Sequence, residues 1–158
     1  MVKAKDIVSD YNGYDYKKIF WEDADRKYED AADRMAVKKL LPKHMDKFVD
    51  IAGGYGRLAD EYIPRSKSAT LFDYSQSELD DAKKKYGKKL NTVQGDIYKL
   101  PFKDGEFSSL MMIRATHHFK DIDKVVAAFN LFKEIAPDVK AEGELQLDSA
   151  IVPEVAKS

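Results

Sequence analysis

Cysteine is absent from the 158-residue sequence, which excludes disulfide bonds, thiolate metal sites and cysteine nucleophiles. The chain also has no charge imbalance, since 27 lysine and arginine residues oppose 28 aspartate and glutamate residues. Nucleic-acid and anionic membrane partners therefore have no electrostatic support. No apolar run approaches the roughly 18 residues of a membrane span, and the polar start does not match a signal peptide. We expect a soluble, cytoplasmic protein with no nucleic-acid or membrane partner.

Glycine is also sparse, yet it clusters between residues 48 and 59, in the segment FVDIAGGYGRLA. An apolar run ends in glycine and restarts as an amphipathic segment, which predicts a buried strand, a tight turn and a helix. Glycine permits such a turn and leaves room for a ligand, which the N–H groups of the helix can bind. Asp50 falls at the carboxyl end of the strand, where ligands of parallel sheets bind. A GxGxxA dinucleotide site and a purely structural turn are the alternatives.

The rest of the sequence alternates between helical and strand patterns. Apolar residues recur at three- and four-residue steps from Trp21 to Leu41, and a capping box at Ser75 opens a helix that Gly87 ends. Aromatic residues such as Trp21 and Tyr28 either pack on the domain or form a lid over a ligand. Further strands are predicted at 69–72, 91–95, 108–113 and 144–148.

This alternation predicts an α/β fold, a Rossmann-like, doubly wound and mainly parallel sheet of about five strands. We expect residues 1–45 to form a helical arm or lid, 46–150 to form the core and 151–158 to form a tail. Asp73 ends the second strand about 20 residues after the glycines, where an acidic side chain binds ribose hydroxyls in nucleotide-binding sheets. Stabilisation of the next helix is the alternative role of this carboxylate.

Four stretches resemble, in order, a class I S-adenosylmethionine-dependent methyltransferase of the small-molecule type: residues 50–56, Asp73, 95–102 (GDIYKLPF) and 112–119 (MIRATHHF). The resemblance implies binding of S-adenosylmethionine and its product S-adenosylhomocysteine by a SAM-binding Rossmann-like core. The implied cofactor residues are Asp50, Ala52, Gly53, Gly54 and Gly56 near the methionine end, Asp73 and Tyr74 near the ribose and adenine, Asp96 and Ile97 at the adenine, and Arg114 beside the transferred methyl group.

The sequence departs from this family in two ways. Ala52 stands where the family usually has its first glycine, and the chain lacks the usual C-terminal strand pair. A shortened sheet would expose the edge of its fifth strand, which proteins normally cover. We therefore expect the tail or a second copy of the chain, as a homodimer, to cover that edge.

Transfer of a methyl group from a sulfonium is an in-line displacement that needs mainly position and a dry site. His117 is the candidate catalytic base and His118 its alternative, because histidine titrates near neutrality. Arg114 is the second candidate catalytic residue, and it either holds an anionic substrate or pairs with a neighbouring acid. No metal site is expected. The predicted function is methyl transfer to an unidentified small molecule, and the alternatives are an inactive SAM/SAH-binding module or a NAD-binding domain.

Overall fold

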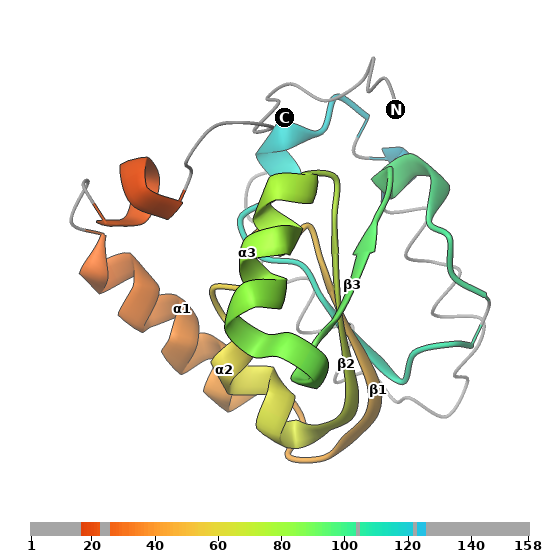
Figure 1. Cartoon of the computed structure of the whole chain (residues 1–158), viewed down its shortest axis with the longest axis horizontal. Helices are drawn as coiled ribbons and strands as arrows, with labels where there is room; N and C mark the ends of the chain where they lie inside the picture. Colours follow the sequence, from red (N-terminus) through yellow and green to blue (C-terminus); the bar gives the residue numbers. More distant parts are fainter. Residues whose placement is uncertain (1–16, 23–25, 104, 122, 126–158) are drawn as a thin grey trace.

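The computed structural model describes residues 17–22, 26–103, 105–121 and 123–125 (Figure 1). None of the helices in these ranges is long and apolar enough to span a membrane. The helices and strands follow one another in this order: η1 (Lys17–Glu22), α1 (Lys27–Leu40), β1 (Met45–Ile51), α2 (Ala59–Tyr62), η2 (Ile63–Arg65), β2 (Ser66–Asp73), α3 (Gln76–Tyr86), η3 (Gly87–Lys89), β3 (Asn91–Gln94), η4 (Ile97–Lys99), β4 (Ser109–Met111) and η5 (Thr116–His118).

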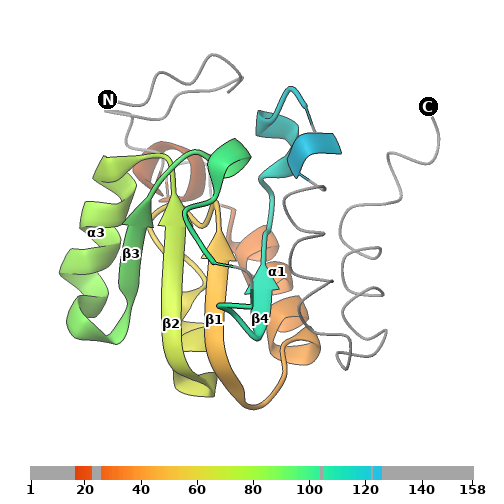
Figure 2. The ribbon, with the colours of Figure 1, turned by 90° about the vertical axis from the view of Figure 1, so that its right-hand side faces the viewer.

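The four described strands form one parallel sheet in the order β3-β2-β1-β4 (Figure 2). β1 pairs with β2 on one side and with β4 on the other, so that Asp50 is opposite Leu71 and Met111. The strand order reverses between β1 and β4, and ligands of open α/β sheets bind in the crevice at such a switch point. The Rossmann-like fold is confirmed with four strands, and the predicted fifth strand at 144–148 lies outside the described residues.

Both faces of the sheet are covered, as a parallel sheet requires. Phe48 contributes to a core cluster with side chains of α1, α2 and α3, and Figure 1 shows these three helices together on one side of the strands. Val49 and Ile51 alternate with Phe48 and belong to a second cluster with Ile97 and Val125. Successive side chains of β1 therefore pack against opposite layers.

Helix α1 packs on the core mainly through charged side chains. The sequence predicts a helix from Trp21, but α1 begins at Lys27 and η1 forms a separate π-helical turn before it. Val37 is the one fully buried residue of α1, whereas Tyr28 is 84% and Met35 is 69% exposed. Arg34 instead donates to the carbonyl oxygen of Arg57 at 2.8 Å, which joins α1 to the start of α2. Tyr28 therefore does not pack on the domain.

Candidate functional site

The turn after β1 begins against the end of β2. The Ala52 N–H donates to the Phe72 carbonyl oxygen at 2.8 Å, which extends the pairing of β1 with β2 into the first residue of the turn. Ala52 has a φ of 56° and Gly54 a φ of 57°, both in the left-handed region that favours glycine. A Cβ on Gly53 would lie 2.5 Å from Asp50 Oδ2, so only glycine lets the turn pass over this carboxyl group.

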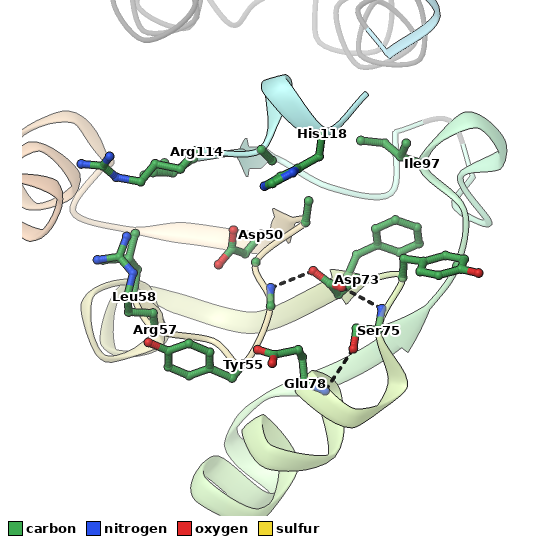
Figure 3. Close-up of a pocket in the computed structure, with 18 of the residues that line it drawn as sticks. Asp50, Tyr55, Arg57, Leu58, Asp73, Ser75, Glu78, Ile97, Arg114 and His118 are labelled. Atoms are coloured by element: carbon green, nitrogen blue, oxygen red, sulfur yellow. Dashed lines mark hydrogen bonds between the residues drawn. The ribbon is translucent and has the colours of Figure 1, made fainter. Parts of the chain in front are cut away.

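The Asp73 carboxylate connects this turn to the next helix (Figure 3). Its Oδ2 accepts from the Gly54 N–H and its Oδ1 from the Ser75 N–H, both at 2.8 Å. Ser75 is the N-cap of α3, and its Oγ accepts from the Glu78 N–H at 3.4 Å, as the capping box predicts. Burial raises the pKa of Asp73, while hydrogen bonds from backbone N–H groups oppose the shift. An ionised carboxylate offers about four lone pairs, so Asp73 retains acceptor capacity for a ligand.

Asp50 is buried beneath the same turn, at 3% exposure. Burial raises the pKa of Asp50 to about 7, with a smaller contribution from the Asp73 charge, while the neighbouring Tyr62 hydroxyl and Arg57 oppose the shift. A positively charged group placed beside Asp50 would favour the ionised carboxylate. The carboxyl end of the sheet therefore suits a ligand that combines hydroxyl groups with positive charge.

A pocket opens at this end of the sheet, beside η5 and the end of β4 (Figure 3). The predicted site residues that line it are Asp50, Ala52, Gly53, Gly54, Asp73, Tyr74, Ile97 and Arg114. Three others do not line it. Gly56 donates its N–H to the Gly53 carbonyl oxygen within the turn, Asp96 accepts from the Tyr98 N–H at 2.9 Å and caps η4, and His117 is exposed.

Several lining residues carried no clear functional signal in the sequence. Arg57 lines the pocket, although the sequence marks it only as the start of a helix, and Phe119 lines it as the last residue of the stretch 112–119, within which the sequence assigns no role to that ring. Glu78 also lines it, and its capping-box position is the signal that could have placed it beside the turn. Trp21 lines the pocket, in line with the alternative that an aromatic residue covers the ligand.

The side of the pocket near β4 carries Arg114 and His118. Arg114 Nε donates to Asp33 Oδ2 at 2.7 Å and its Nη2 donates to Asp33 Oδ1 at 3.1 Å. Of the two alternatives for Arg114, the structure therefore shows the pairing with a neighbouring acid.

His118, rather than His117, lines the pocket, and the centres of the two rings are 3.8 Å apart. Burial, with repulsion from His117, lowers the pKa of His118 to about 4. The imidazole is therefore neutral at pH 7, able to accept a proton but weakly basic. Among the residues that the structure describes, no group of three or more histidine and acidic side chains could hold a metal ion.

The end of the chain has a second similarity. Residues 113–158 match the family model of phosphate acetyl/butyryl transferases. A phosphate acetyltransferase of Acetivibrio thermocellus is 61% identical over 36 residues, which are 23% of this chain and 11% of that protein. The matched region includes the predicted fifth strand and lies mostly beyond the described residues.

Residues 49–132, which contain the glycine turn, Asp73 and the end of β4, match the family model of methyltransferase domains. The fold resembles an S-adenosylmethionine-dependent methyltransferase from Clostridium acetobutylicum, with a TM-score of 0.55 and 23% identity over 76% of this chain and 50% of that one. A methyltransferase structure from Bacillus halodurans gives a TM-score of 0.54 and 28% identity over 65% and 46%. The [4+2]-cyclase SpnF gives 0.57 and 14% over 65% and 40%. This chain thus spans about half the length of these proteins or less, and it belongs to the class I S-adenosylmethionine-dependent methyltransferase family.

Proposed function

We propose that the pocket binds S-adenosylmethionine and that the protein transfers its methyl group to a small molecule. The observation that carries this proposal is the position of Asp73, whose carboxylate lies between the glycine turn and the N-terminus of α3. It can accept hydrogen bonds from vicinal ribose hydroxyls there. Asp50 lies at the end of the adjacent strand and supplies a carboxyl group for the positive charge of the same ligand.

Apolar side chains of the described residues suit the adenine end of this ligand. Ile97 and Phe72 line the pocket on the side of β2 and η4, and Phe72 packs edge-to-face against Phe102 with ring centres 5.4 Å apart. Such a surface excludes water and holds a flat heterocycle by contact area. Asp96 does not line the pocket, so contact between its carboxylate and the adenine amino group would need a local movement of η4.

The bound cofactor would supply an activated methyl group, because its sulfonium is already a good leaving group. The protein then needs to hold the acceptor in line and keep water out. His118 is neutral at pH 7 because of its low pKa, so it can receive a proton that the acceptor releases, but it cannot ionise an acceptor of high pKa in advance. Its role is therefore to collect a proton rather than to generate a strong nucleophile.

An inactive binding module is the second candidate, because the proposed cofactor contacts come from β1, β2, α3 and η4 and binding there needs no methyl acceptor. Calorimetric binding without methyl transfer to any of a panel of small acceptors would favour this function. We propose no acetyl transfer, because the similarity covers 11% of the phosphate acetyltransferase.

The role of Asp73 can be tested by calorimetry with S-adenosylmethionine, S-adenosylhomocysteine and NAD. We expect the first two to bind and NAD not to bind. Asp73→Asn keeps the size of the side chain but removes its charge, and we expect it to weaken S-adenosylhomocysteine binding by about tenfold or more. Asp46→Asn is the control, because Asp46 is an exposed partner of Lys67. Binding of NAD alone, or unchanged affinity in Asp73→Asn, would refute this assignment.

A further inference from the structure

Asp33 on α1 contacts both arginines that border the pocket. Its Oδ2 accepts from Arg57 Nη2 at 2.6 Å and from Arg114 Nε at 2.7 Å, and its Oδ1 accepts from Arg114 Nη2 at 3.1 Å. The Asp33 and Arg57 side chains are only 14% and 11% exposed, so solvent screens this pair less than a surface pair. One carboxylate of α1 therefore joins the turn after β1 to the end of β4.

Arg57 in turn contacts Trp21. Its guanidinium carbon lies 3.7 Å from the centre of the indole ring, a distance typical of stacking between a guanidinium and an aromatic ring. Asp30 accepts from the other terminal nitrogen of Arg57, so two carboxylates define the plane of the guanidinium. The indole ring that stacks on this plane lines the pocket.

Both arginines that border this part of the pocket are paired with carboxylates. They belong to one connected group of ion pairs, formed by Arg34, Lys38, Arg57 and Arg114 with Asp30, Asp33 and Glu61. The arginines therefore give little attraction for an anionic acceptor. Trp21, Ile113 and Phe119 supply apolar surface on the same side of the pocket.

We propose that Asp33 is a positioning residue that fixes Arg57, Arg114 and, through Arg57, the Trp21 ring as the acceptor-facing wall of the pocket. This wall suits an uncharged acceptor with an apolar or aromatic surface. The inference rests on the proposed methyl transfer, because it assigns the side of the pocket opposite the cofactor. It adds a role for α1, whose charged face otherwise only attaches the helix to the core.

Fluorescence tests this role directly, because Trp21 is the only tryptophan in the sequence. In Asp33→Asn, Arg57 and Arg114 lose their shared partner, and we expect Trp21 emission to shift to longer wavelength and acrylamide quenching to rise about twofold. Iodide quenching should rise more than acrylamide quenching, because the arginine charges are no longer neutralised. S-adenosylhomocysteine affinity should stay within about twofold, since Asp33 does not line the cofactor half.

Asp46→Asn is again the matched control, and it should leave the Trp21 signal unchanged. Arg57→Lys keeps the positive charge but removes the planar guanidinium on which the indole ring stacks, so it should shift Trp21 emission in the same direction as Asp33→Asn and serves if that variant fails to fold. Unchanged emission in both variants would refute the positioning role. Stronger quenching of wild-type Trp21 by the anion iodide than by neutral acrylamide would show that the wall attracts anions. That result would refute the inference that the acceptor is uncharged. If the wild-type protein does not bind S-adenosylhomocysteine, that result would instead refute the proposed function.

Discussion

At the scale of single residues, Asp50 combines a proposed binding role with a cost in stability. Its pKa is raised to about 7 by burial, so between about pH 4 and 7 the folded protein keeps a proton that the unfolded chain releases. The free energy of unfolding therefore falls as pH rises through this window. A shift of about three pKa units corresponds to about 4 kcal/mol.

We predict that Asp50→Asn raises the free energy of unfolding above about pH 7 and weakens binding of S-adenosylmethionine at the same pH. Urea unfolding at about pH 5 and about pH 8 measures the first effect, and calorimetry measures the second. The raised pKa of Asp73 also makes the free energy of unfolding fall as pH rises, whereas the lowered pKa of His118 makes it rise. Both groups remain in the variant, so the difference from wild type isolates Asp50. A variant that is less stable at about pH 8 would contradict this account.

At the scale of elements, the turn between β1 and α2 contains a strained residue. Ala52 has a φ of 56°, a conformation that costs an L-residue about 1–2 kcal/mol. Glycine removes this strain. It also gives the unfolded chain more conformational entropy, which lowers the free energy of unfolding by about 0.5–1 kcal/mol. The usual glycine of the family therefore fits this backbone better than alanine does.

We predict that Ala52→Gly raises the free energy of unfolding by up to about 1 kcal/mol, as measured by urea denaturation. Gly54→Ala is the matched control. It places a Cβ on a residue with a φ of 57°, at 3.3 Å from Glu78 Oε2, and it should destabilise the protein. Equal effects of the two substitutions would show that the φ values do not control stability here.

Local sequence patterns predicted the helices and strands well. They did not predict the contacts between residues that are far apart in the sequence. The apolar run before the glycines, the capping box at Ser75 and the left-handed Gly87 each act within a few residues, and the structure confirms them. The pairing of Arg114 with Asp33 joins residues 81 positions apart, and no spacing in the sequence indicates it. The choice of His118 over His117 depends on the direction of η5, which a pair of adjacent histidines does not define.

At the scale of the whole molecule, β4 is the last strand on its side of the described sheet. Among the described strands, β4 pairs only with β1, through residues 109–111. The sequence predicts a fifth strand at 144–148, within the region that resembles a phosphate acetyltransferase. Proteins normally cover an open edge, because its free N–H and C=O groups favour pairing with other chains.

We predict that residues 144–148 pair along this edge and that their backbone amides exchange slowly with solvent. Hydrogen exchange followed by mass spectrometry measures this directly, and the slowly exchanging amides of β1 and β2 serve as the internal reference. Fast exchange at 144–148 would show that the predicted strand is wrong. A dimeric mass by light scattering would then support a second copy of the chain at β4.

The residues of one half of the pocket lie close together in the sequence, whereas those of the other half lie far apart. The proposed cofactor half uses residues of β1, β2, α3 and the start of η4, which follow one another between residues 45 and 97, whereas the proposed acceptor wall joins Trp21 and Asp33 to Arg114. Contacts between near neighbours form earlier than those that close long loops. In a chain that emerges from the ribosome, the glycine turn and its contacts with Asp73 can therefore form before β4 and Arg114 have left it.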